Sequence, residues 1–143
     1  MAHIWLKVDK TKPVFMKKIF TLFGALFILA LISFRPLSGL DDVINALRNG
    51  NATELTRYID DNIEISLPDK SNSYSRAQAA VILQDFFNTN GVKNFAVTHK
   101  GDNKGSQFCI GNLQTRSGTY RTTVFMKTKN GKQVVKEIRF QAS

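Results

Sequence analysis

Apolar positions along this chain follow two periods, and the change between them separates helices from strands. Apolar side chains recur every three or four residues at 40–47, 55–59 and 79–87, which predicts three amphipathic helices. Between the second and third of these, Ile63, Ile65 and Leu67 alternate with polar residues, which predicts a half-buried strand that ends at Pro68. The predicted order is helix, helix, strand, helix.

The predicted helices begin and end at residues that favour such boundaries. Gly50 favours a left-handed stop, and Asn51 suits the N-cap of a second helix directly after it. Ser75 and Gln78 have the spacing of a capping box before the third helix, and Gly91 follows its last residue. We therefore expect a tight helical hairpin around Gly50 and a separate third helix.

Four strands are predicted after residue 91. Their sequences are NFAVTHK, SQFCIGNLQT, TYRTTVFMKTK and QVVKEIRFQ. Asn130-Gly131 is a strong signal for a hairpin turn, so the strands are expected to form an antiparallel meander. Gly111 lies in the middle of its strand and indicates a bend or bulge, which a strongly curved sheet requires. The polar segment DKSNSYS, between Pro68 and the third helix, is interpreted as a loop.

Residues 16–39 have the features of an export signal. Lys17 and Lys18 precede an apolar run of 14 residues at 19–32, which is shorter than the roughly 20 residues that span a bilayer. We expect export to the periplasm or the cell exterior, with Met16 as the true start and residues 1–15 as an upstream extension. The alternative is an uncleaved anchor that holds the protein at the membrane through residues 19–34. Residues 40–143 then have the length of one domain.

Charge is divided unevenly within that domain. Residues 40–90 carry four basic and eight acidic side chains, whereas residues 91–143 carry ten basic and two acidic ones. The expected explanation is a solvated, lysine-rich meander that carries Lys127, Lys129, Lys132, Lys136 and Arg139, with Lys136 and Arg139 on opposite faces of their strand. The alternative is a surface for an anionic partner. Export and the lack of interleaved aromatic side chains argue against nucleic acid.

The stretches QAAVILQDFF and IGNLQTRSGTYRTTVFMK resemble an uncharacterised family of exported bacterial proteins, known as a domain of unknown function. The order of elements over residues 40–142 resembles the nuclear transport factor 2-like superfamily. This resemblance implies an α+β fold, in which a curved antiparallel sheet wraps around three helices as a cone. The superfamily contains isomerases, dehydratases, cyclases, ligand binders and interaction modules, so the fold alone does not select a function.

The resemblance also locates the positions at which steroid isomerase-like members keep their catalytic groups. Leu67 stands at the position of the general base, and Val43 stands near that of the tyrosine which stabilises the oxyanion. Aliphatic side chains can neither accept a proton nor donate a hydrogen bond. Asp69 follows Pro68 but lies in the predicted loop, where a solvated carboxylate is the expected state. We therefore assign no catalytic residue.

Five residues remain as candidates for contacts with a ligand at the mouth of the cone: Tyr74, Phe87, His99, Tyr120 and Arg121. Each also has a structural explanation. Phe87 belongs to the apolar face of the third helix, and His99 continues the strand face of Phe95 and Val97, where a hydrogen-bonded histidine is the simpler expectation. Tyr120 and Arg121 point to opposite faces of one strand.

No cofactor or metal is expected. His3 lies in the leader, so the domain has a single histidine, and Cys109 is the only cysteine. Cys109 is interpreted as a buried thiol within a strand. A nucleophile elbow of the form G-x-S-x-G does not occur.

Two classes of function follow from these observations. The first is an exported, non-catalytic domain that binds a small apolar ligand in the cone or docks on a protein, such as a second copy of itself, through the sheet. The second is an enzyme of the isomerase, dehydratase or cyclase type with a rearranged pocket. Polar groups converging in a pocket would favour the enzyme, and a filled cone would favour the binding domain.

Export is tested by fractionating cells that express the tagged full chain, which we expect to find outside the cytoplasm. Translation from Met16 should give the same distribution, because residues 1–15 contain no part of the apolar run. A soluble cytoplasmic pool of the unprocessed chain would contradict the prediction, and retention in the membrane would support the anchor.

Overall fold

The computed structural model describes residues 39–143, which form three helices and six strands. The helices are α3 (Gly39–Asn49), α4 (Ala52–Thr56) and α5 (Arg76–Asn90), and the strands are β1 (Ile59–Leu67), β2 (Lys70–Ser75), β3 (Val92–Asn103), β4 (Ser106–Thr115), β5 (Gly118–Lys129) and β6 (Lys132–Ala142). The expected signal segment lies outside the described residues, except for Gly39. None of the described helices combines the length and the apolar character needed to cross a membrane.

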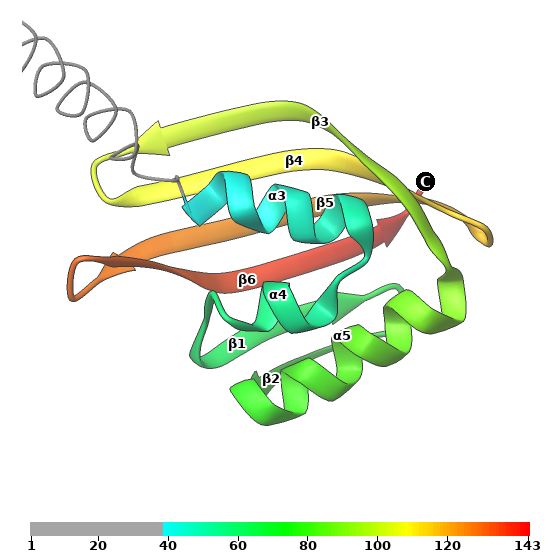
Figure 1. The fold of residues 1–143 in the computed structure, drawn as a ribbon, viewed down its shortest axis with the longest axis horizontal. Helices are drawn as coiled ribbons and strands as arrows, with labels where there is room; N and C mark the ends of the chain where they lie inside the picture. The colour runs from blue at the N-terminus through cyan, green and yellow to red at the C-terminus, as the bar shows by residue number, and fades with distance from the viewer. Residues whose placement is uncertain (1–38) are drawn as a thin grey trace, which may run out of the picture. The chain divides into compact units, whose positions relative to one another are not determined.

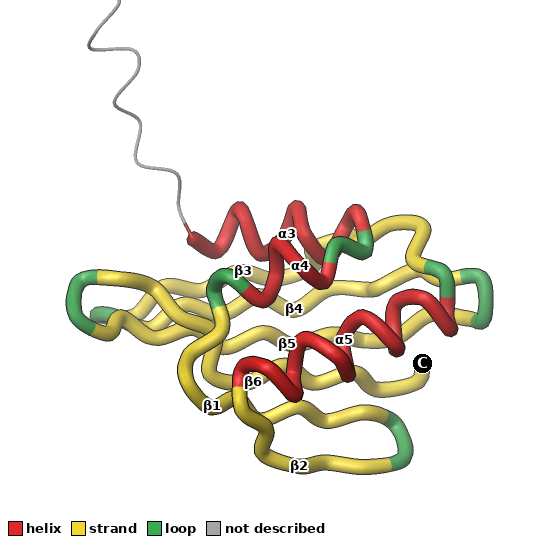
Figure 2. The backbone as a smooth tube through the Cα atoms, turned by 60° about the horizontal axis from the view of Figure 1, so that its bottom comes forward, coloured by secondary structure: helices red, strands yellow, loops and turns green. Residues whose placement is uncertain are grey.

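The six strands form one sheet in the order β2-β1-β6-β5-β4-β3. All neighbouring strands are antiparallel except β1 and β6, which are parallel, so the sheet is mixed. The three helices cover one face of this curved sheet (Figures 1 and 2). We call the opposite face the open face. The fold is therefore the expected α+β cone, and strands β3 to β6 are the predicted meander.

One predicted element is wrong, because the segment interpreted as a polar loop forms strand β2. Ile63 of β1 pairs with Tyr74 of β2, and Leu67 pairs with Lys70 across the turn at Pro68. Strand β2 is at the edge of the sheet, and most of its side chains are exposed. A strand with few buried positions lacks the alternation that identifies strands in a sequence.

The helix boundaries follow the predicted capping residues. Gly50 has a φ of +60°, and the side chain of Asn51 accepts a hydrogen bond of 3.1 Å from the backbone of Glu54. Ser75 and Gln78 form a reciprocal capping box at the start of α5. These local bonds make α3 and α4 a tight hairpin and start α5 directly after β2.

A bulge and a close backbone approach interrupt the regular pairing of β3 with β4. Thr98 is an extra residue in β3, because Val97 pairs with Gly111 and His99 pairs with Ile110. A Cβ atom at Gly111 would lie 2.6 Å from the carbonyl oxygen of Ala96 and 2.7 Å from the ring of Phe95. Gly111 therefore allows the backbone of β3 and an aromatic ring to approach β4 closely, as its sequence position indicated.

Helix α5 is anchored to the sheet by an aromatic cluster. Phe86 and Phe87 are buried, and the ring centroid of Phe86 lies 4.6 Å from that of Phe140 on β6 and 5.3 Å from that of Tyr120 on β5. Phe87 meets Phe140 edge-on at 6.3 Å. Burial of such rings is among the largest contributions that a side chain makes to stability.

A charged cluster holds β1 and β6 together at a second bulge. Lys136 is the extra residue of β6, since Phe125 pairs with Glu137 and Met126 with Val135. The carboxylate of Asp60 accepts hydrogen bonds from Lys136 at 2.7 Å and from Lys129 at 2.9 Å. These bonds hold the pKa of Asp60 well below its ordinary value although the residue is buried. The bond from Lys136 has the larger effect and the bond from Lys129 the next. The cluster thereby fixes which β6 side chains reach the open face.

Replacing Phe86 by alanine should lower the free energy of unfolding by about 3–5 kcal/mol, because a cavity would remain between α5 and the sheet. Val81→Ala is the matched control on the same helix, since Val81 is 69% exposed and its truncation should cost less than about 0.5 kcal/mol. Chemical denaturation of the three proteins checks the prediction. Equal stability of wild type and Phe86→Ala would mean that α5 does not anchor the sheet.

Replacing Asp60 by asparagine should lower the free energy of unfolding by about 2 kcal/mol at neutral pH, because two charged hydrogen bonds are weakened. Since the folded-state pKa is depressed, the stabilisation is present above the unfolded value of about 3.9 and is lost as the pH falls toward the folded one. Denaturation across this range should show the wild type and the variant converging at low pH. Asp69→Asn, in the exposed turn between β1 and β2, is the control, and a difference independent of pH would contradict the account.

Candidate functional site

The positions that carry catalytic groups in steroid isomerase-like proteins are apolar here and contribute to packing. Val43 is fully buried in the core, and Leu67 packs against the same core. Asp69 is exposed in the turn between β1 and β2. None of these three side chains can transfer a proton inside the cone.

The interior of the cone is occupied by the aromatic cluster, which includes two of the five candidate residues. Phe87 is 3% exposed. Tyr120 packs its ring against Phe86 and donates a hydrogen bond of 2.9 Å from its hydroxyl group to Oδ1 of Asn90. Both side chains therefore have structural roles at this position, and the hydroxyl of Tyr120 is engaged.

Asn90, the last residue of α5, binds the turn between β4 and β5 and the strand that follows it. Besides Tyr120, the hydroxyl of Ser117 donates to Oδ1 of Asn90 at 2.6 Å, and Nδ2 of Asn90 donates to the carbonyl of Phe86 at 2.8 Å. The backbone of Arg116 donates to the carbonyls of Asn90 and Gly91. The turn between β4 and β5 is thus tied to the last residues of α5, which closes one end of the cone.

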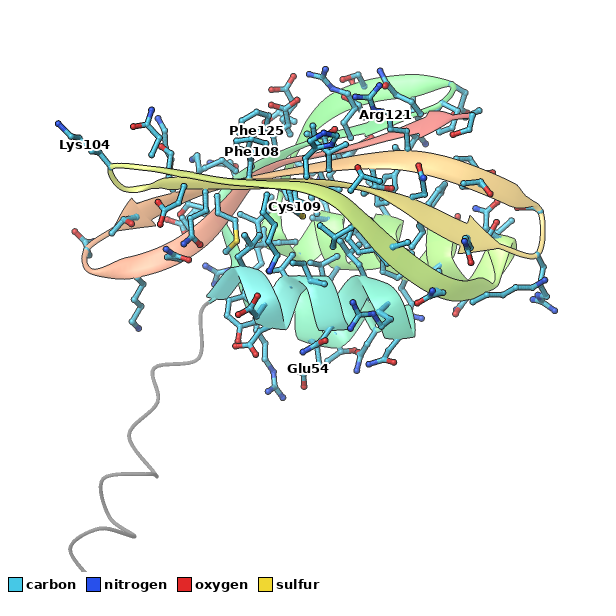
Figure 3. The ribbon with its side chains drawn as sticks, turned by 90° about the horizontal axis from the view of Figure 1, so that it is seen from above. Glu54, Lys104, Phe108, Cys109, Arg121 and Phe125 are labelled. Atoms are coloured by element: carbon cyan, nitrogen blue, oxygen red, sulfur yellow. The ribbon has the colours of Figure 1, made fainter. Side chains whose placement is uncertain are left out.

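The other three candidates lie apart from this cluster. Tyr74 is half-buried on edge strand β2, and Arg121 is exposed on the open face (Figure 3). His99 was expected on the face of Phe95 and Val97, but the extra residue Thr98 reverses the alternation and places His99 beside Ile110 on the open face. The five candidates therefore do not form one pocket.

The described residues support neither a cysteine nucleophile nor a metal site. Cys109 is fully buried on the face of the sheet that the helices cover (Figure 3). Burial raises the pKa of its thiol to about 11, so the nucleophilic thiolate is scarce at neutral pH. Between residues 39 and 143 no group of three or more His, Cys, Asp or Glu side chains is arranged to hold a metal ion.

The basic meander is exposed but partly neutralised within the chain. All five of the expected side chains are exposed, namely Lys127, Lys129, Lys132, Lys136 and Arg139. Lys129 and Lys136 bind Asp60, and Nη2 of Arg139 lies 2.6 Å from a carboxylate oxygen of Glu137. The meander is therefore less attractive to polyanions than its composition indicates.

Three hollows in the described surface are candidate ligand sites. A groove of about 690 Å³ runs between α4 and α5, with Ala52, Ala80 and Val81 as apolar lining. A notch of about 420 Å³ lies where β1 ends beside β6, and a third hollow of about 320 Å³ lies near Asp41 and Lys100. None of the five candidate residues lines any of the three.

The open face carries a feature that sequence reasoning missed. Phe125 of β5, 44% exposed, pairs with Phe108 of β4, and their ring centroids are 6.0 Å apart (Figure 3). A Cβ atom at Gly101 of β3 would overlap the ring of Phe108, so this glycine gives the ring its place above β3. Ile110 extends the apolar surface along β4. Strand alternation assigns Phe125 to the face of Arg121, but only the register between β4 and β5 places Phe108 beside it.

Comparison with known proteins identifies the family of this chain and finds solved structures with the same fold. Residues 40–141 match the family described as Domain of unknown function (DUF4783). No curated protein matches the chain. A crystal structure of a DUF4783 family protein from Bacteroides uniformis is 31% identical, with a TM-score of 0.70, and the match covers 72% of this chain and 95% of that one.

Two more solved structures show how far the similarity extends. A DUF4783 family protein from Bacteroides fragilis is 32% identical, with a TM-score of 0.68 and coverage of 71% of this chain and 96% of that one. An NTF2-like protein of unknown function from Cytophaga hutchinsonii is 10% identical, with a TM-score of 0.56 and coverage of 77% and 94%, and shares the fold alone. Both expected resemblances are confirmed: the fold is NTF2-like, and the chain belongs to the DUF4783 family.

Proposed function

We propose that this protein is an exported, non-catalytic domain that binds a protein partner through the open face of its sheet. The observation that carries the proposal is the exposed Phe125 beside Phe108, on a face that no described helix covers. Aromatic side chains near the centre of a surface are the usual anchors of protein interfaces. Export is part of the proposal because of the signal-like residues 16–39.

The charges around the aromatic pair favour a protein over a polyanion or a lipid surface. Glu137 lies next to Phe125 across the β5–β6 pair, and Glu64 lies next to Glu137 on β1. Arg139 and Arg121 supply the opposite sign on the same face. A mixture of both signs around an apolar centre suits the polar rim of a protein interface, and the two carboxylates lie nearest to the aromatic pair.

The enzymatic alternative has weaker support. It needs polar groups that converge where a substrate can enter, and the cone instead contains Phe86, Phe87 and Phe140 in mutual contact. The notch at the end of β1 is polar, with Glu64 and Arg139 in its lining, but it lies at the surface beside β6. A packed interior favours an interaction domain.

The proposal is tested by introducing a photo-crosslinking amino acid at Phe125 and, as a control, at Val81 on α5. Both side chains are exposed, but only the first lies on the open face. We expect irradiation of the native host to give a discrete protein adduct for the Phe125 variant and none of the same mass for the Val81 variant. If the Phe125 variant gives no adduct under conditions in which it is exported and folded, the open face is not a protein-binding surface.

A further inference from the structure

We propose that the groove between α4 and α5 is a further binding site, and that it takes a short apolar peptide whose two termini are free. The peptide lies extended along α5, with its carboxylate beside Arg57 and Arg76 and its ammonium group beside Asp85. The lining of the groove comes from α4, its C-cap and α5 alone. The inference therefore goes beyond the proposed function and does not depend on the open face.

The groove has the size of a ligand site. Its volume of about 690 Å³ is the largest of the three hollows described above, and ligand sites commonly measure about 300–1,000 Å³. Helices α4 and α5 lie side by side along it (Figures 1 and 2). A ligand can therefore lie lengthwise between the two helices.

The middle of the groove is apolar. Val81, which is 69% exposed, lies in its lining with Ala80 and Ala52. Within the described residues only Phe125 is another large apolar side chain with comparable exposure. The hydroxyl of Thr56, in the same lining, donates a hydrogen bond of 2.6 Å to the carbonyl of Ala52. Apolar side chains of a ligand can therefore cover this part of the groove without leaving that hydroxyl unpaired.

Two guanidinium groups lie at one end of the groove. Arg76 is the first residue of α5, and its Nε donates at 3.0 Å to the carbonyl of Ile59, two residues beyond Arg57. Nη1 of Arg57 lies 3.2 Å from Glu54, and Nη2 of Arg76 lies 3.5 Å from Asp61. Ion pairs between solvent-accessible side chains are weak, and each guanidinium has more N–H donors than these contacts use. A carboxylate can therefore bind both arginines.

A carboxylate lies further along α5. Asp85 is exposed, lines the groove and forms no ion pair with another residue between 39 and 143. The groove thus has positive charge at one end, an apolar middle and a negative charge beyond it. This order of charges is complementary to a molecule with a carboxylate at one end and an ammonium group at the other.

The spacing of the opposite charges matches an extended peptide of about four residues. Arg76 and Asp85 are nine residues apart, which is a rise of about 13–14 Å along a helix. An extended chain advances by about 3.3–3.6 Å per residue, so its two termini reach both charges when it has about four residues. Every second side chain of the peptide then points toward Ala80 and Val81.

A peptide fits this lining better than other anions do. A fatty acid matches the arginines but leaves Asp85 without a partner, and a polyanion is repelled by that carboxylate. Peptide groups also find polar partners along the groove, in the exposed side chains of Thr53, Gln84 and Asn88.

The test is a titration of the full chain, purified after export and labelled with ¹⁵N, with the tetrapeptide Ala-Leu-Leu-Ala, followed by NMR. We expect shifts of the backbone amides of α4 and α5. Acetylation of the peptide's amino terminus or amidation of its carboxyl terminus should each weaken binding about fivefold, as expected for the loss of an exposed ion pair. Ala-Leu-Ala should also bind more weakly, because it cannot reach both charges.

Two variants identify the partner of each terminus. Asp85→Asn should weaken binding of the free tetrapeptide about fivefold and leave the affinity for the acetylated one unchanged. Arg76→Gln should do the same for the free and the amidated peptide. Asp69→Asn and Arg48→Gln, at exposed positions outside the groove, are the matched controls and should bind like wild type.

A free tetrapeptide that shifts no amide of α4 or α5 at millimolar concentration would overturn the inference. Equal affinity of the wild type for the free and the acetylated peptide would overturn it too, because Asp85 would then not read the ammonium group. The photo-crosslink at Phe125 reports on the open face, so failure of one proposal is distinguished from failure of the other.

Discussion

The contact between Phe86 of α5 and Phe140 of β6 both anchors the helix to the sheet and occupies the interior of the cone. The two ring centroids are 4.6 Å apart, and both side chains are buried. This packing joins α5, the longest helix of the described residues, to the centre of the sheet, and Phe87 and Tyr120 complete the cluster. The same contact fills the space in which other folds of this shape can keep a ligand, so the packing that stabilises residues 39–143 also occupies the interior of their cone.

A filled interior leaves the outside of the sheet as the surface with the most distinctive chemistry. The three helices all lie on one face, and the other face presents Phe108 and Phe125 among charges of both signs (Figure 3). Two bulges decide which side chains appear there: Thr98 turns His99 outward, and Lys136 sets the side of Glu137 while its own amine binds Asp60. The local irregularities of the sheet are therefore what gives the open face its composition.

The sequence was informative wherever structure depends on neighbouring residues. Helical spacing and the caps at Asn51 and Ser75 predicted the helices, and Asn130-Gly131 predicted the last hairpin, where both residues have positive φ. Edge strand β2 was missed because its exposed side chains give no alternation. The face of His99, the pairing of Phe108 with Phe125 and the bonds of Asp60 to Lys129 and Lys136 depend on bulges and register between distant segments, which periodicity cannot specify.

The central claim, that the interior of the cone is a packed core with no room for a ligand, is tested most directly by a crystal of the protein under xenon pressure. Xenon enters apolar cavities that are large enough to hold it. The account predicts no xenon among Phe86, Phe87, Phe140 and Tyr120. A xenon atom bound between these rings would reveal an apolar cavity in the cone and would contradict the account.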